Sequence, residues 1–219
     1  MKRFPFFSVI VFLSLLAACA KTAINNSSAN SATSLWPLKA GNSWVYTDSI
    51  FDNNGNLLNA YNDSTFISSK TTTKNGINFY AYNDSLGWFG ADGYVAVDAS
   101  NTTLYGLDSL NATSPYLFFA TVPYDGYVIG SSQDFSNPSC IGTDALYGFA
   151  STYTVKGYTC YKTLEDVKDC NGNIIYADVY YISPGVGIVR IEEYSAVPNS
   201  TSNALYLDYS QTLGKDKIN

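Results

Sequence analysis

Turn signals recur about every eight to twelve residues from Leu35 onward, and this spacing constrains the fold most strongly. Between the turns lie short runs rich in β-branched and aromatic residues, which favour strands. The sequence predicts an all-β fold: a single antiparallel β-meander domain whose sheet is strongly curved or forms a half-open barrel, with little helix. We expect strands at 43–51, 57–68, 77–83, 94–98, 103–107, 116–122, 146–155, 158–167, 174–182, 186–194 and 204–213.

Two segments do not follow this pattern of short strands separated by turns. Residues 123–138 contain Gly126, Gly130 and several serines, and this composition predicts a long loop. The single helix candidate is a short turn near Leu107 to Thr113.

The segment that ends at Cys19 is predicted to be an export signal and not part of the fold. Lys2 and Arg3 precede an apolar run over 4–16 that is short for a membrane span. The Leu-Ala-Ala-Cys junction at 16–19 resembles the lipobox of bacterial lipoproteins. The resemblance implies cleavage before Cys19 and lipid on its sulfur and new amino group. An ordinary signal with an accidental cysteine is the alternative.

The chain divides into four predicted segments. Residues 1–18 form the signal peptide, 19–34 the lipid anchor and flexible tether, 35–214 the β domain, and 215–219 a C-terminal tail. The tether is small and polar without periodicity. No aspartate follows Cys19 and no acidic run is present, so we expect an exported outer-membrane lipoprotein that faces the periplasm. We expect the lipid on Cys19 to attach the protein to a membrane. The sequence identifies no protein partner.

Composition excludes several functional classes. The chain carries a net charge of -6 and has no basic patch, which argues against nucleic-acid binding. It contains no histidine, the commonest general base and zinc ligand. Ser-His-Asp hydrolysis, Cys-His proteolysis and histidine-based metal sites are therefore excluded. We expect no cofactor and no metal.

Three cysteines remain after Cys19, an odd number for an oxidising compartment. A two-residue turn at 156–157 would place Cys160 inside a strand ladder and Cys170 opposite Thr143, three residues from Cys140. The sequence therefore predicts a Cys140–Cys170 disulfide and a buried free thiol at Cys160.

Short motifs at both ends of the predicted domain resemble a lipoprotein family. Residues 35–46 read LWPLKAGNSWVY, and residues 183–189 read SPGVGIV. They are similar to the P-L-x-x-G-N-x-W-x-Y opening and P-G-V-G-x-V closing strand of uncharacterised lipoproteins of Gram-negative bacteria. The resemblance implies a shared fold and location and carries no activity.

Two groups of acidic residues suggest functional sites, and each group also has a purely structural explanation. Asp52 and Asp169 begin D-x-N-G-N segments, which indicate hairpin turns, with a weak cation site as the alternative. Glu192 and Glu193 are adjacent on a strand and must point to opposite faces. Asp178 and Glu192 could approach across a hairpin, so a carboxylate-pair hydrolase is the enzymatic alternative to a non-catalytic protein.

Aromatic residues supply the candidate ligand contacts. They gather around a Gly-Trp-Phe-Gly tip at 87–90, where Trp88 is the best single candidate for an exposed contact. Exposed aromatics on a rigid sheet stack on sugar rings or apolar ligands, and the alternative is that they build the core. The candidate ligand-binding residues are Tyr80, Tyr82, Trp88, Phe89 and Tyr94.

Four Asp-Ser motifs resemble the O-glycosylation site used by one group of Gram-negative bacteria, in which Asp precedes Ser or Thr and then an aliphatic residue or Thr. The candidate acceptors are Ser49, Ser64, Ser85 and Ser109.

Three functions fit these observations. The first is a lipid-anchored, non-catalytic binding module that holds a glycan or similar ligand on exposed aromatics. The second is a carrier of an apolar ligand in a lipocalin-like or half-barrel cavity, and the third is a structural envelope component. An exposed aromatic face, an apolar cavity or a filled core would distinguish them.

Overall fold

The structure is a computed structural model that describes residues 34–83, 93–107, 109–134, 139–198 and 204–219. These residues belong to one compact unit, Ala32–Asn219. They form twelve strands: β1 (Ser43–Phe51), β2 (Leu57–Lys74), β3 (Ile77–Asn83), β4 (Tyr94–Val97), β5 (Thr103–Leu107), β6 (Tyr116–Ala120), β7 (Tyr127–Asp134), β8 (Gly142–Val155), β9 (Tyr158–Lys168), β10 (Ile174–Ser183), β11 (Gly187–Ala196) and β12 (Leu205–Lys217).

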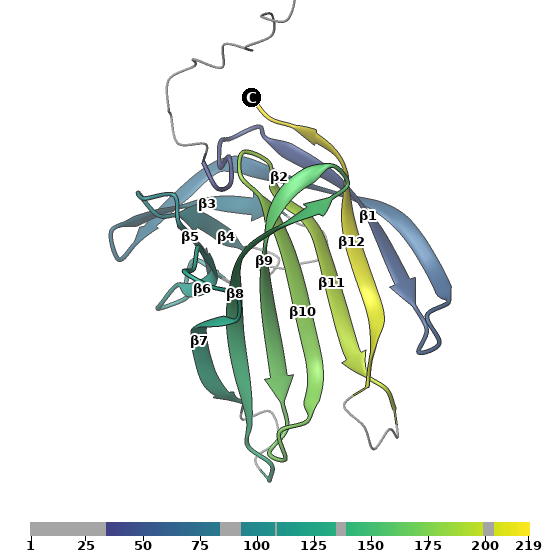
Figure 1. The fold of residues 1–219 in the computed structure, drawn as a ribbon. Coiled ribbons are helices and arrows are strands. Elements are labelled where there is room, and N and C mark those ends of the chain that lie inside the picture. Colours follow the sequence, from purple (N-terminus) through teal and green to yellow (C-terminus); the bar gives the residue numbers. More distant parts are fainter. Residues whose placement is uncertain (1–33, 84–92, 108, 135–138, 199–203) are drawn as a thin grey trace, which may run out of the picture. The chain divides into compact units, whose positions relative to one another are not determined.

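All of these strands form one antiparallel sheet in the order β6-β5-β4-β3-β2-β1-β12-β11-β10-β9-β8-β7 (Figure 1). Each half of the order follows the chain, so the sheet consists of two meanders, β1–β6 and β7–β12. Pairing of β1 with β12 joins them, with Tyr46 opposite Leu213. The predicted antiparallel meander is confirmed.

The sheet is strongly curved and nearly closed. Its edge strand β6 contacts β7 and β8, which lie at the opposite edge of the strand order. Phe118 of β6 packs edge-on against Tyr180 of β10, with ring centroids 4.6 Å apart. The concave face is therefore the interior of the domain, and β6 covers part of it.

Three sequence expectations about the elements were wrong. Segment 123–138 contains strand β7, because its glycine and serine residues pair with β8 despite their low strand propensity. The helix candidate near Leu107 to Thr113 is instead a turn, in which the Ala112 amide donates to the Ser109 carbonyl at 3.1 Å. Strand β12 runs to Lys217, through part of the expected tail. No helix in the described ranges has the length and apolarity to span a membrane.

The opening and closing motifs meet in the core at one end of the sheet. The Trp44 indole donates to the Val186 carbonyl at 2.7 Å, and the Tyr46 hydroxyl donates to the Ile188 carbonyl at 3.0 Å. Trp36 is fully buried and packs edge-on against Trp44, with centroids 5.8 Å apart. We call Trp36, Trp44 and Tyr46 with the 186–188 turn the tryptophan lock. It holds the first strand to the β10–β11 hairpin across β12.

The predicted disulfide is present. Cys140 and Cys170 are bonded, and Cys160 is a buried free thiol whose pKa burial raises to about 11. The bond ties the segment before β8 to the β9–β10 turn.

The register behind this disulfide prediction was only partly correct. Val155 lies opposite Tyr158, as the two-residue turn predicts. A bulge between Phe149 and Tyr153 then shifts the ladder, so that Thr143 faces Lys168 and not Cys170. The shift moves Cys170 nearer to Cys140 along the strands, which is why the pairing itself was correct.

The tryptophan lock gives the first testable prediction. Gly187 has a φ of +100°, and a Cβ there would lie 2.2 Å from Trp36 Nε1. Gly187→Ala should therefore lower the free energy of unfolding by about 2–4 kcal/mol through backbone strain and overpacking. Urea unfolding measures the change.

Gly130 provides the matched control for this substitution. Nothing lies within 4 Å of a Cβ added at Gly130. Gly130→Ala should leave the free energy of unfolding nearly unchanged. Equal effects of the two substitutions would show that Trp36 does not pack on Gly187.

Candidate functional site

A cavity of about 600 Å³ lies between β6 and the facing strands β7–β10. Strand β6 forms one wall because closure of the sheet brings Phe118 over Tyr180. The aromatic and aliphatic lining residues are Tyr116, Leu117, Phe118, Leu146 and Tyr180. The polar lining side chains are Ser131, Ser132, Asp144 and Glu165.

Strand register explains why acidic and apolar side chains share this cavity. Leu146 of β8 lies directly opposite Glu165 of β9, so both occupy the concave face. Tyr180 is two residues from Asp178 on β10 and faces the same way. The interior surface therefore alternates apolar walls with carboxyl groups.

Three carboxyl groups line up across neighbouring strands on this face. Asp178 of β10 lies opposite Glu165 of β9 and also opposite Glu193 of β11. We call Glu165, Asp178 and Glu193 the carboxylate row. Neighbouring strands are about 4.8 Å apart, and like charges directly opposite each other are unfavourable.

Burial changes the chemistry of the row. It raises the pKa of Glu165 to about 7, and the charges of Asp144 and Asp178 and a hydrogen bond with Asp144 raise it further. Burial raises the pKa of Asp178 to about 6, against the lowering effect of the Tyr176 and Tyr180 phenols. Burial raises the pKa of Glu193 to about 7, with the charges of Asp178 and Asp208 adding to the effect.

Asp178 is the most buried member of the row. It is 6% exposed, and its Oδ2 accepts a hydrogen bond from the Tyr180 hydroxyl at 3.0 Å. Its Oδ1 is buried and has no hydrogen-bond partner. Among the residues that the structure describes, no lysine or arginine is one of the groups that shift the pKa values of the row.

A further buried acid lies on the concave face beyond the row. Asp48 of β1 is fully buried, and its Oδ1 accepts a hydrogen bond from the Tyr209 hydroxyl at 2.7 Å. Burial raises the pKa of Asp48. Tyr209 in turn lies opposite Glu193, so acids and phenols extend from β9 to β1.

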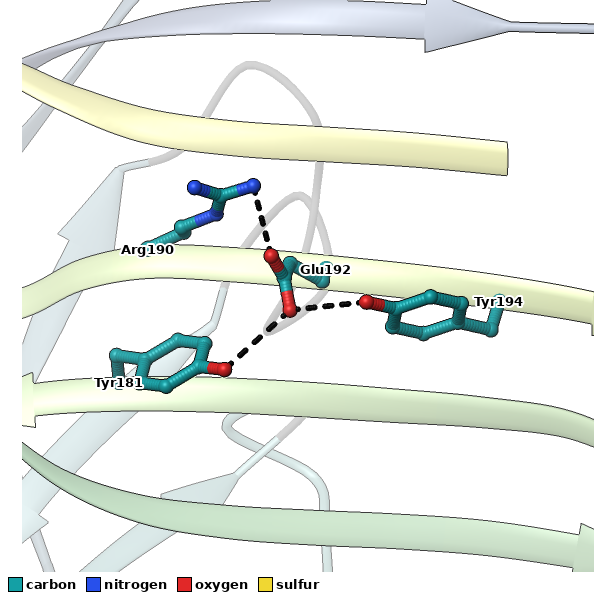
Figure 2. A network of polar contacts seen from close by, with 4 residues as sticks. All are labelled: Tyr181, Arg190, Glu192 and Tyr194. Carbon is teal, nitrogen blue, oxygen red and sulfur yellow. Dashed lines mark hydrogen bonds and ion pairs between the residues drawn. The ribbon is translucent and has the colours of Figure 1, made fainter. Parts of the chain in front are cut away.

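The convex face of β10 and β11 shows the opposite arrangement, in which the acid is fully partnered. Glu192 forms an ion pair with Arg190 at 2.7 Å and accepts hydrogen bonds from the Tyr194 hydroxyl at 3.1 Å and the Tyr181 hydroxyl at 3.4 Å (Figure 2). Glu192 and Glu193 do point to opposite faces. The expected approach of Asp178 and Glu192 was wrong, because Glu192 pairs with Val179.

The structure corrects the expected aromatic contact surface. Tyr82 and Tyr94 are 2% and 5% exposed. Tyr82 packs against Trp36 in the main core, and Tyr94 belongs to a second small cluster with Phe79. Tyr80 is half-buried against the main core. These three tyrosines build the core because opposite faces of β3 and β4 are both covered.

Other predicted sites have simpler outcomes. Trp88, Phe89, Ser85 and Cys19 lie outside the described residues, so their roles stay predictions. Of the remaining candidate acceptors, Ser64 is exposed, whereas Ser49 and Ser109 are half-buried.

The two D-x-N-G-N segments are turns that satisfy their own acids. The Asp52 carboxylate accepts both the side-chain and backbone N–H groups of Asn56, and Asp169 does the same with Asn173. These bonds lower the pKa of each aspartate, with the side-chain amide contributing most. Within the described ranges, no three Cys, Asp or Glu side chains are arranged to hold a metal ion.

The carboxylate row predicts an unusual pH dependence of stability. Its folded-state pKa values are raised, so the folded protein binds protons more tightly than the unfolded chain. The free energy of unfolding should therefore fall as the pH rises from about 5 to about 8. The aspartates with lowered pKa values titrate below this window. Urea unfolding at both pH values measures the change.

Removing one carboxylate from the row should restore part of the free energy of unfolding that is lost at high pH. Glu165→Gln should raise the free energy of unfolding at pH 8 by on the order of 2 kcal/mol and have little effect at pH 5. Glu192→Gln is the matched control on the convex face and should give no gain, since it removes the ion pair with Arg190. A protein that becomes more stable between pH 5 and pH 8 would not contain buried acids of this kind.

Comparison with known proteins gives only distant likenesses. No family model and no curated protein matches the chain. A structure described as a "putative lipoprotein" from Parabacteroides distasonis is 16% identical, with a TM-score of 0.44, over 84% of this chain and 99% of that chain. A "putative exported protein with YmcC-like fold" from Bacteroides fragilis is 14% identical, with a TM-score of 0.39, over 83% and 98%. Conclusions about function therefore depend on the geometry of this chain alone.

Proposed function

We propose that this chain is an exported, lipid-anchored envelope protein that binds a small ligand in the cavity beneath β6. The observation that carries the proposal is the cavity itself, about 600 Å³ in volume and lined by aromatic walls with convergent polar groups. Small-molecule sites in proteins have this size and this mixture of surfaces. The site differs from an exposed aromatic platform because its ligand is held inside the curved sheet.

Export is supported by two independent features of the chain. The Leu-Ala-Ala-Cys junction at 16–19 has the order of an anchored lipoprotein signal. The Cys140–Cys170 disulfide belongs to an oxidising compartment, such as the periplasm or the outer surface. Lipid on Cys19 would hold the β domain at a membrane, and the outer membrane facing the periplasm is the location that we propose.

Binding fits the cavity better than carboxylate-pair hydrolysis. A glycosidase needs two carboxyls about 5 Å apart or more, so that the substrate bond lies between them. Both Glu165 and Asp144 line the cavity, and they interact closely enough for Asp144 to raise the pKa of Glu165, which favours their acting as one polar patch. The pair instead presents one continuous polar surface to a bound molecule.

The cavity is tested by filling it. Gly130 lies in the cavity wall opposite Leu146, and nothing lies within 4 Å of a Cβ added there. A panel of small aromatic amines, alcohols, acids and oligosaccharides is screened by thermal shift against the wild type and Gly130→Phe. Compounds that stabilise the wild type should not stabilise Gly130→Phe.

Gly130→Ala is the control for the cavity test, because it adds one methyl group and should retain binding. A ligand that stabilises Gly130→Phe as strongly as the wild type binds elsewhere. A panel in which no compound stabilises the wild type contradicts the proposed function.

Anchoring is tested separately by metabolic labelling. Labelled palmitate should enter the wild type and fail to enter Cys19→Ser, because the thioether and the new N-terminus both depend on this cysteine. Cys160→Ser should retain the label, since Cys160 is buried in the β domain. Equal labelling of Cys19→Ser and the wild type would disprove the anchor.

A further inference from the structure

We propose that the chain carries a second ligand site, for an acidic sugar, on the convex face of the sheet. The site is a pocket of about 300 Å³ lined by the end of β8, its turn into β9, and strands β10 and β11. Its aromatic and charged lining residues are Tyr153, Lys156, Tyr181, Arg190 and Glu192. The pocket shares no lining residue with the cavity beneath β6, so the inference goes beyond the proposed function.

Strand register brings these side chains to one face. Tyr181 of β10 lies opposite Arg190 of β11 on one side and opposite Lys162 of β9 on the other. Directly opposite residues of neighbouring strands point to the same face. Glu192 is two residues from Arg190 and shares that face (Figure 2). The register therefore places an aromatic ring between two cations, with one acid beside them.

Two tyrosines supply the aromatic part of the pocket. Tyr153 and Tyr181 are both half-buried, and their rings pack edge-on with centroids 6.2 Å apart. The Lys162 ammonium lies 4.9 Å from the centroid of the Tyr153 ring, a contact that stabilises the position of this ring. Half-buried tyrosine rings held in this way present an apolar surface with a polar edge, which suits stacking on a sugar ring.

The pocket has more positive charge than its own acid balances. Arg190 Nη2 forms an ion pair with Glu192 Oε1 at 2.7 Å, whereas Arg190 Nε is buried without a hydrogen-bond partner. A guanidinium has several N–H donors, so this ion pair uses only part of its capacity. Lys156 is exposed, and no carboxylate of the described ranges forms an ion pair with it. The unused donors and the second cation favour an anionic group on the ligand.

Lys156 is an unusual residue for its backbone conformation. Both residues of the 156–157 turn have positive φ angles, +48° and +85°, as a type I′ turn requires. The β2–β3 hairpin has the same combination at Asn75 and Gly76, and Asn-Gly is the favoured sequence for this turn. A lysine is strained where an asparagine is not. Such departures from local preference are concentrated at functional sites, and this one lines the pocket.

These groups together select an acidic sugar over a plain anion. Arg190 and Lys156 favour a carboxylate, while the negative charge of Glu192 opposes an anion that brings no hydrogen-bond donor. In the described part of the chain Glu192 Oε1 pairs only with Arg190, so it can accept a sugar hydroxyl. A pocket of about 300 Å³ lies at the lower end of the range for ligand sites, which fits a single sugar ring.

The inference is tested by saturation-transfer NMR titration of the lipidated protein in a polyoxyethylene detergent, with methyl β-D-glucuronide as the probe. Methyl β-D-glucoside is its neutral analogue with the same ring, and sodium acetate supplies a carboxylate without the ring. The glucuronide should bind about tenfold more tightly than either, because only it combines a charge-assisted hydrogen bond with the ring contacts. Absence of glucuronide binding, or equal affinity for the three compounds, overturns the inference.

Lys156→Asn is the most specific variant, because it introduces the favoured turn sequence and should not lower the free energy of unfolding. It should lower the affinity for the glucuronide about threefold and leave the affinity for the glucoside unchanged. Lys70→Asn is the matched control, since it removes the same charge from β2, outside the pocket, and should change neither affinity. Arg190→Gln should lower the glucuronide affinity at least about tenfold. Unchanged glucuronide affinity in either pocket variant overturns the inference.

Gly130→Phe separates this site from the cavity beneath β6. Gly130 lines that cavity and not the pocket, so the variant should leave glucuronide affinity unchanged. If Gly130→Phe abolishes glucuronide binding, the sugar binds in the cavity, which supports the proposed function and overturns the second site. If glucuronide binding depends on Lys156 and Arg190 while no compound binds in the cavity, the inference holds and the proposed function fails.

Discussion

The contact between Phe118 of β6 and Tyr180 of β10 is the interaction on which the interior of this protein depends. The two rings lie 4.6 Å apart, although β6 and β10 are far apart in the strand order. The contact holds the β6 edge over the concave face, which turns an open curved sheet into a nearly closed one. The cavity is lined by residues of β6 on one side and by Glu165 of β9 among others on the facing strands.

Closure has an energetic cost that the rest of the core must offset. Glu165, Asp178 and Glu193 are buried in the interior, with Glu165 and Glu193 each opposite Asp178 on a neighbouring strand. The tryptophan lock lies in the same core and buries Trp36, Trp44 and Tyr46 almost completely. A stable aromatic core at one end allows an unfavourable acidic surface in the interior, and such unfavourable groups are concentrated at functional sites.

Local pattern was enough to predict most of the strands, because β1, β3 and β5 combine clear turns with β-branched and aromatic runs. It failed for β7, where Gly130 and its serine neighbours have low strand propensity and pairing with β8 decides the structure. The Cys140–Cys170 bond was predictable because a short hairpin fixes its approximate register.

The candidate site was not predictable in the same way. Glu165, Asp178 and Glu193 are far apart in sequence, and their alignment depends on the registers of two hairpins with bulges. The available signal was an aspartate between Tyr176 and Tyr180, in the inward phase of a strand. The tyrosines of β3 and β4 gave the stronger compositional signal, but they belong to the core.

The candidate site and the expected pH dependence both require that the carboxyl groups of the row are buried and protonated near neutral pH. Carbon-13 NMR of the glutamate carboxyl groups, followed from pH 3 to pH 9 and assigned with Glu165→Gln and Glu193→Gln, measures this property. We expect Glu165 and Glu193 to titrate near pH 7. Midpoints near the ordinary value of 4.5 would show that the interior is open to water and would contradict the burial of the carboxylate row.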